Sequence, residues 1–349
     1  MQERGRAGCA LFSYFCFLTV ATVVLPAGCS GGGRPAQSGA LPSLGALPSF
    51  GASAALGTRV GEGKAKKPTP LLFAADYGSG AIYAYDLAGQ GQSPIWTLSG
   101  APLKYPAGLW VDGSLNLYVS DQGGYVFEYD APTASGPPGS PNFTYIDPNE
   151  FPVDVAACGN YVYAANAFGL NGAQSLTVWK KGVADPLTIA TSPRYGDGVG
   201  YGVTCDATGG GHIYFGFDYA DNGPGGIDEW APDGSGTPTS LPMLPAYLEG
   251  LAKSQAGVFV LGDPFASQGA AIQFYKETGK SPTHQLVKSW IGNPVGFAYE
   301  AGDKALWVAD GEYATLTRIA PAKGTVLNTI VKPGFSNLDG VAVSPPDHP

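Results

Sequence analysis

A strand-like segment recurs six times between residue 106 and the C-terminal end, and its spacing constrains the fold more than any other feature. The copies are PAGLWVD (106–112), PVDVAAC (152–158), GYGVTCD (200–206), LEGLAKS (248–254), PVGFAYE (294–300) and LDGVAVS (338–344). The third residue of each copy is Gly or Asp, and successive third residues lie 46, 48, 48, 46 and 44 positions apart. Repeats of this length indicate one supersecondary unit per repeat.

Each unit contains further short strand-like segments. A second segment recurs as LFAAD (72–76), LYVSD (117–121), VYAAN (162–166), IYFGF (213–217), VFVLG (258–262) and LWVAD (306–310). A third segment carries Tyr85, Tyr129, Trp179, Trp230, Tyr275 or Ile319 just before a turn, and a less regular fourth segment follows, as in IWTLS (95–99), NFTYI (142–146) and QLVKSW (285–290). Four strands in a period near 46 residues are typical of a propeller blade. The sequence therefore predicts an all-β, six-bladed β-propeller, and all six tryptophans are expected in its strands.

The order of the segments predicts how the ring closes. The second segment of the first unit begins at Leu72, before any entry strand, whereas the last entry strand, 338–344, has no strand after it. We expect the C-terminal strand to complete the first blade as its innermost strand, because closure removes the open edges of the ring.

The N-terminal residues predict export. Arg4 and Arg6 precede a sixteen-residue apolar run, Ala10 to Leu25, which is shorter than the roughly 20 residues that span a membrane and has the layout of a signal peptide. Residues 29–69 are rich in Gly, Ala, Ser and Pro and are expected to form a flexible linker. The predicted organisation is a signal peptide (1–28), a linker (29–69) and a propeller (70–349).

The end of the apolar run, Leu25-Pro26-Ala27-Gly28-Cys29-Ser30, resembles the lipobox of bacterial lipoproteins, although Pro26 stands where that family usually has Leu. The resemblance implies that Cys29 is acylated and becomes the mature N-terminus. It also implies, through Ser30, retention in the outer membrane of a Gram-negative cell. The alternative is an ordinary signal peptide cut near Gly28.

The charge distribution argues against nucleic-acid binding. Seven of the 19 basic side chains but only two of the 28 acidic ones lie in residues 1–69, which leaves 12 against 26 and a net charge of −14 for residues 70–349. Such a surface repels phosphate backbones. We expect a monomer whose partners are the membrane, through the lipid anchor, and an unidentified protein or small-molecule ligand.

The second-segment endings, LYVSD and LWVAD, resemble NHL-repeat and gluconolactonase-like propellers over residues 70–345. Members of such folds include binding proteins and enzymes. In the gluconolactonase-like proteins, acidic and amide side chains hold a divalent cation at the channel mouth. Asp154, Glu249 and Asp339 interrupt or adjoin the entry-strand glycines, and because entry strands line the central channel we expect these carboxylates near one mouth as a candidate ligand or metal site. Oxygen ligands would suit Ca²⁺ or Mg²⁺, although the family's own ligand motifs are not matched in this sequence. The alternative is that these carboxylates cap loop amides or face a water-filled channel.

Polar residues also end the second segments, namely Asp76, Asp121, Asn166, Asp218, Asp263 and Asp310. They recur once per blade, so we expect them to bind backbone amides of the following turns rather than a metal ion. A further acidic stretch, from Asp218 to Asp228, lacks the spacing of a calcium loop and is expected to be a solvated turn.

Cys158 and Cys205 lie on consecutive entry strands, four and three residues past the shared Gly/Asp position. The opposite parity of these offsets directs the two side chains toward facing surfaces of adjacent blades. An exported protein permits the bond, so we expect a disulfide, with two buried thiols as the alternative.

No catalytic set is evident. The sequence contains no G-x-S-x-G, and its three histidines, His212, His284 and His348, fall at unrelated positions. The favoured function is a non-catalytic cell-envelope lipoprotein whose propeller presents loops for binding. The alternative is a metal-dependent lactonase or related hydrolase that uses Asp154, Glu249 and Asp339.

Overall fold

The computed structural model describes residues 69–87, 92–148, 151–167, 173–192, 195, 202–206, 211–217, 225–243, 245, 247–302, 304–332 and 334–346. The predicted signal peptide, Cys29 and the predicted linker as far as residue 68 lie outside the described residues, as does Asp218. No helix in the described part of the chain is long and apolar enough to cross a membrane.

The strands form six separate four-stranded antiparallel sheets, each one blade. Blade 1 consists of β24 (Leu338–Ser344), β1 (Leu71–Asp76), β2 (Ala81–Asp86) and β3 (Trp96–Ser99). Blade 2 consists of β4 (Pro106–Val111), β5 (Leu117–Asp121), β6 (Tyr125–Tyr129) and β7 (Phe143–Ile146). Blade 3 consists of β8 (Pro152–Cys158), β9 (Tyr161–Asn166), β10 (Ser175–Lys180) and β11 (Thr188–Ala190).

The second half of the ring repeats this order. Blade 4 consists of β12 (Gly202–Cys205), β13 (Ile213–Phe217), β14 (Gly226–Trp230) and β15 (Thr239–Ser240). Blade 5 consists of β16 (Glu249–Lys253), β17 (Val258–Asp263), β18 (Ala271–Lys276) and β19 (His284–Val287). Blade 6 consists of β20 (Pro294–Tyr299), β21 (Leu306–Asp310), β22 (Thr315–Ala320) and β23 (Thr325–Val331). The predicted six-bladed propeller is confirmed.

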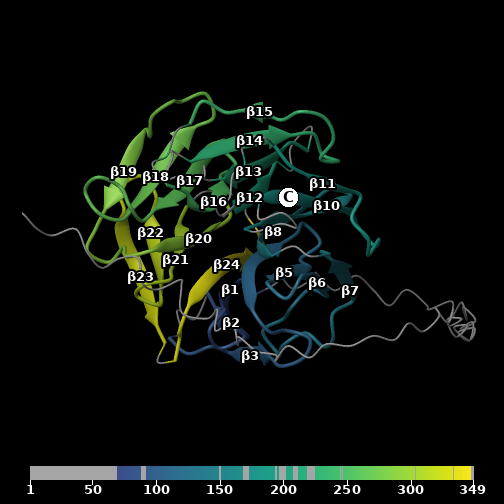
Figure 1. The fold of residues 1–349 in the computed structure, drawn as a ribbon. Coiled ribbons are helices and arrows are strands. Elements are labelled where there is room, and N and C mark those ends of the chain that lie inside the picture. The colour runs from purple at the N-terminus through teal and green to yellow at the C-terminus, as the bar shows by residue number, and fades with distance from the viewer. Residues whose placement is uncertain are drawn as a thin grey trace, which may run out of the picture. The chain divides into compact units, whose positions relative to one another are not determined.

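The C-terminal strand closes the ring as predicted. β24 pairs antiparallel with β1, from Leu71 opposite Ser344 to Asp76 opposite Leu338. Figure 1 shows the yellow β24 beside the purple-blue β1, with the six sheets arranged around a common centre. The closing sheet therefore joins the two ends of the propeller sequence.

A hydrophobic cluster lies between each pair of neighbouring blades. At the closing junction, Leu72 and Tyr85 of blade 1 pack with Trp307 and Leu316 of blade 6. Five further clusters fill the other junctions. The alternating side chains of each strand thus serve two junctions, one on each face of the sheet. Trp290 is the exception to the tryptophan prediction, since it lies in the turn after β19 and packs there against the cluster between blades 5 and 6.

The entry strands β4, β8, β12, β16, β20 and β24 approach one another closely around the centre. At Gly340, for example, an added Cβ atom would collide with the carbonyl oxygen of Ala107 on the neighbouring entry strand. This explains the recurring glycine in the repeat. Asp154 occupies the equivalent position in blade 3, so its side chain is placed between entry strands.

The ring has two faces. Entry strands begin where second strands end, as in the pairing of Pro106 with Asp121 and of Pro294 with Asp310. We call this side the entry face; it carries the loops that precede entry strands and the turns between second and third strands. The other side, the exit face, carries the remaining turns. Disulfide-bonded Cys158 and Cys205 lie at the exit-face ends of β8 and β12, with Cα atoms 6.4 Å apart, which confirms the predicted bond.

Candidate functional site

A cavity of about 50 Å³ lies among the entry strands at the centre of the ring. Asp154 and Asp339 contribute the only carboxylates among the described residues that line it, and the other lining groups there are apolar or backbone apart from Trp110. Trp110 and Phe297 are its aromatic members, and the indole N–H of Trp110 already donates to the carbonyl oxygen of Ala157 at 3.0 Å. A volume of this size holds roughly three or four water molecules.

Asp154 is fixed by backbone amides. Its two carboxylate oxygens accept hydrogen bonds from Val155 N–H and from Val203 N–H on the next blade, both at 2.9 Å. Burial raises the pKa of Asp154 to about 7, although the two amide bonds act to lower it. Its side chain is enclosed by protein yet partly accessible from the cavity. Asp154 thus faces the cavity, as one of the predicted alternatives has it, but the amides it accepts belong to the entry strands β8 and β12 and not to loops.

Asp339 has a different environment. It is the extra residue of a β-bulge in β24, between Leu338, which pairs with Asp76, and Gly340, which pairs with Ala75. Within the described part of the chain no hydrogen bond or ion pair to its carboxylate is found. Burial, and then repulsion from Asp76, raises the pKa of Asp339 to about 7.

Glu249 is not part of the cavity lining. In β16 the bulged residue is Gly250, which adopts a φ of 66°, so Glu249 is paired with Gly262 instead of being the extra residue as Asp339 is. Its side chain is buried, and Oε2 has no hydrogen-bond partner among the described residues. Burial raises the pKa of Glu249 to about 8; a hydrogen bond from Asn293 lowers it, and Asp339, Asp310 and Asp263 raise it further.

The structure therefore brings Asp154 and Asp339 to one cavity and places Glu249 beside it. Among the described residues, no group of three or more His, Cys, Asp or Glu side chains is arranged to hold a metal ion.

The described strand-end aspartates bind backbone amides, as predicted, but the prediction was wrong at Asn166. Its side-chain amide donates to the hydroxyls of Ser175 and Thr177, and its Oδ1 has no partner among the described residues. Three of the aspartates accept a hydrogen bond from the backbone N–H of an exposed aromatic residue. Asp121 accepts from Tyr105 N–H at 2.9 Å, Asp263 from Phe265 N–H at 3.1 Å and Asp310 from Tyr313 N–H at 2.9 Å. The prediction for the stretch 218–228 was wrong at Asp228, which is buried within β14 and accepts from the hydroxyls of Tyr195 and Ser240.

The aromatic residues on these loops were not found by sequence reasoning. Every strongly exposed aromatic side chain of the described residues lies on the entry face or at its edge: Tyr105, Tyr125, Phe151, Phe265 and Tyr313 are between 36 and 59% exposed. We call Tyr105, Phe151, Phe265 and Tyr313 the rim aromatics, because they lie on entry-face loops. Among the described residues, the exposed large hydrophobic side chains near the exit-face turns are aliphatic, such as Val183 and Leu187.

One aromatic pair connects the rim with the cavity. Tyr77 stacks on Tyr105 with ring centroids 5.3 Å apart. Burial raises the pKa of Tyr77, followed by interactions with Tyr105 and with Asp339 of the cavity lining. The rim and the axial carboxylate are therefore close enough to interact electrostatically.

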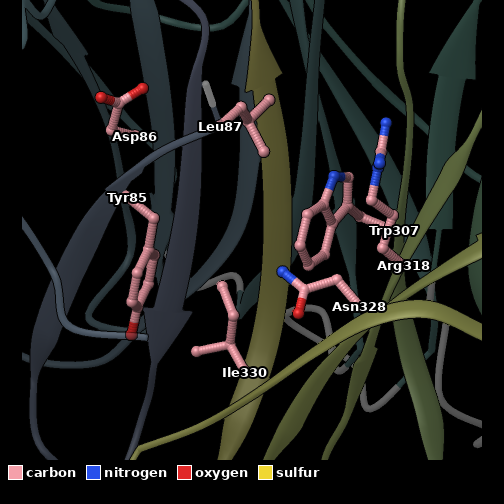
Figure 2. Close-up of a pocket in the computed structure, with 7 residues that line it drawn as sticks. All are labelled: Tyr85, Asp86, Leu87, Trp307, Arg318, Asn328 and Ile330. Atoms are coloured by element: carbon pink, nitrogen blue, oxygen red, sulfur yellow. The ribbon is translucent and has the colours of Figure 1, made fainter. Parts of the chain in front are cut away.

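A second, smaller cleft lies between blades 6 and 1. Figure 2 shows Tyr85, Asp86 and Leu87 on one side and Trp307, Arg318 and Asn328 on the other. Its volume is about 10 Å³, room for roughly one water molecule. Arg318 is engaged by Glu300 through two 2.6 Å hydrogen bonds. This cleft is a packing feature of the closing junction.

Comparison with known proteins identifies the fold only. No protein-family model and no curated protein sequence matches the chain. A chain from a nidogen/laminin complex superposes with a TM-score of 0.59 at 13% identity, over 80% of this chain and 100% of that one. A protein of unknown function from Bacteroides caccae gives 0.57 at 10% identity (79% and 98%). A putative 6-phosphogluconolactonase from Bacteroides fragilis gives 0.52 at 11% (81% and 99%). These structural neighbours range from protein-binding to lactonase-like, and they support a six-bladed β-propeller without a specific function.

Proposed function

We propose that this protein is an exported, lipid-anchored binding protein that recognises its ligand or protein partner with the entry face. The observation that carries the proposal is the placement of the rim aromatics. Aromatic side chains offer large contact areas at low entropic cost and are enriched at binding surfaces. Here buried aspartates fix the backbone of three of them, so the surface is organised before a ligand arrives.

Export and anchoring rest on the sequence of residues 10–30 and on the disulfide. A bond between Cys158 and Cys205 is what an oxidising compartment outside the cytoplasm allows. The first residue of β1, Leu71, pairs with Ser344 at the exit face. The chain therefore enters β1 from the side opposite the rim aromatics.

Site-specific photocrosslinking in the cell envelope tests the binding face. A photoreactive phenylalanine analogue replaces Phe265 or Tyr313 in one set of strains and Leu187, a comparably exposed exit-face residue, in a control strain. We expect discrete adducts from the entry-face positions and none from Leu187. Equal labelling from both faces, or no labelling at either, would reject the proposal. Membrane release of Cys29→Ser tests the anchor separately.

A metal-dependent lactonase or related hydrolase is a second hypothesis, favoured by one observation. Glu249 Oε2 and Asn293 Oδ1 are both buried without partners among the described residues, and their side chains interact. Two adjacent oxygen acceptors close to Asp339 are ligands of the type that Ca²⁺ and Mg²⁺ prefer. Elemental analysis after loading with either ion is decisive: a stoichiometric ion lost in Glu249→Gln supports the enzyme, and an ion-free protein rejects it.

A further inference from the structure

The axial cavity has an unusual combination of lining groups. Its side chains include two carboxylates, from Asp154 and Asp339, and two aromatic rings, from Trp110 and Phe297. Among the described residues, its lining includes no basic side chain and no side-chain hydroxyl or amide. A neutral polar ligand would find few hydrogen-bond donors there, and a metal ion would find too few oxygen ligands in one place.

The environment of Asp339 is a separate observation that favours a cationic ligand in the cavity. Its carboxylate is deeply enclosed, lines the cavity and lacks a partner within the described residues. A buried carboxylate without a counter-ion is costly, whereas pairing with a cation compensates that cost. Asp154 has only one accepted bond per oxygen, so each of its oxygens retains a free lone pair.

Aromatic groups also lie near Asp339 outside the cavity lining. Tyr77, which interacts electrostatically with Asp339, stacks on the exposed Tyr105, and the other rim aromatics lie on the same face. Aromatic faces attract organic cations through their quadrupole and also pack against alkyl chains. If the alkyl chain of a bound cation leaves the cavity on this side, these rings are suited to bind it.

We infer that the axial cavity binds the ammonium or guanidinium group of an alkyl cation, with Asp339 and Asp154 as counter-ions and the aromatic residues as its walls. The inference rests on the proposed function, because it names the ligand chemistry of the entry face. The cation is either a free alkylamine or alkylguanidine or the side chain of a lysine or arginine in a peptide, and both present the same group to the cavity.

Binding should depend on pH. Asp339 is faced by Asp76 from β1 and influences Tyr77 and Glu249, while Asp154 is faced by the amides of Val155 and Val203. Burial raises the pKa of both cavity carboxyl groups to about 7, so they ionise over the physiological range. A cation binds the ionised form, and its affinity should rise by about tenfold per carboxylate between pH 6 and pH 8.

Calorimetric titration of the purified protein tests the inference. The probes are hexylamine, hexylguanidine, the neutral hexanol and a blocked lysine peptide beside its acetyl-lysine form. We expect the charged probes to bind and their neutral counterparts to bind at least about tenfold more weakly. Binding of the lysine peptide but not of hexylamine would show that the cation comes from a protein side chain. Binding of hexylamine but not of the peptide would show that the ligand is a free amine.

Variants assign the effect to the cavity. Asp339→Asn and Asp154→Asn should each weaken hexylamine binding by about tenfold or more and reduce its pH dependence. Asp185→Asn removes the same charge from the exposed exit-face turn of blade 3 and should have no effect. Thermal unfolding shows whether each variant is folded. If Asp154→Asn does not fold, Asp339→Asn alone tests the cavity.

Three results would overturn the inference: equal binding of hexanol and hexylamine, unchanged affinity in Asp339→Asn, or binding of Ca²⁺ in place of the amine with the same carboxylate dependence. None of them affects the photocrosslinking result. If any of these results is obtained while Phe265 and Tyr313 still give crosslinked adducts, the entry face remains the proposed binding face and only the cationic ligand is rejected.

Discussion

The entry and exit faces of the ring use carboxylates in different ways. On the entry face, Asp121 and Asp310 accept hydrogen bonds from backbone amides of the loops. On the exit face, acidic residues after the entry strands pair in addition with basic side chains. Asp112 accepts hydrogen bonds from the backbone N–H groups of Ser114 and Asn116 through one oxygen and bonds Lys181 of the next blade through the other, at 2.9 Å. Lys253 of blade 5 similarly lies 3.3 Å from Asp206 of blade 4 and 4.1 Å from the ring centre of Tyr214.

We infer from this difference that the two faces have different roles: contacts on the exit face hold the blades together, and the entry face presents a surface. On the exit face, side chains bond to side chains across blades, and a disulfide adds a covalent link between blades 3 and 4. On the entry face, buried aspartates bond mainly to backbone amides of the loops, and several aromatic side chains of those loops are exposed. Four predictions test this division of roles, in order of decreasing expected effect.

Asp121→Ala should have the largest effect. The substitution removes the acceptor for three backbone amides, those of Lys104, Tyr105 and Gly123, in a site with 1% exposure. We expect a loss of about 3–5 kcal/mol in the free energy of unfolding, because buried amides left unpaired keep their desolvation cost. Denaturant unfolding measures it. A loss below about 1 kcal/mol would show that the aspartates do not organise the entry face.

Removal of the disulfide should come next. The double variant Cys158→Ser/Cys205→Ser opens a link across 47 residues of sequence, and we expect a loss of about 2–4 kcal/mol in unfolding free energy. Adding reductant to the wild-type protein during unfolding should reproduce the loss, whereas the double variant should not respond to reductant. If the free energy of unfolding of the wild-type protein is unchanged under reducing conditions, the disulfide does not contribute to holding the blades together.

Glu249→Gln should stabilise the protein in a pH-dependent way. The pKa of Glu249 is raised from 4.5 to about 8 in the folded state, so the folded state binds more protons and stability falls as pH rises through this interval. The glutamine variant avoids this cost. We expect no difference near pH 4.5 and a gain on the order of 2–4 kcal/mol at pH 8 and above. Melting curves across this range check it, and a gain that is equal at all pH values would contradict the protonation argument.

Phe265→Ala should have the smallest effect on stability, since its side chain is 59% exposed. We expect a change within about 0.5 kcal/mol in unfolding free energy, equal to that of Leu187→Ala on the exit face. Ligand binding should differ sharply between the two, with hexylamine or crosslinked-partner binding weakened only in Phe265→Ala. Equal effects of the two variants on binding would show that the faces are not functionally distinct.

The repeat made the architecture predictable, because every blade needs the same strands, the same crowded glycine and the same strand-end acceptor. The cysteine pair followed from the parity of its offsets for the same reason. Glu249 was harder to place, since the position of a β-bulge decides which side chain faces the channel. In β16 the bulge lies at Gly250, and in β24 it lies at Asp339. A shift of one residue thus separates two carboxylates that occupy the same place in the repeat.

The rim aromatics escaped the sequence analysis because they do not follow the repeat. Tyr105 and Phe151 immediately precede entry strands, whereas Phe265 and Tyr313 lie two and three residues after a strand-end aspartate. Their exposure depends on how loops from neighbouring blades pack together, which a single repeat unit does not encode. Trp290 shows the same limit, since its turn position reflects an outer strand that ends at Val287.

The closing sheet has a consequence for how the chain can be rearranged. Because Leu71 and Ser344 are direct partners at the exit face, a short peptide joining residues 346 and 69 would make the propeller sequence continuous. New ends could then be opened in an exit-face turn of another blade, for instance between β10 and β11. Such a circular permutant would keep every entry-face loop intact, so we expect it to fold and to retain the binding proposed for the entry face.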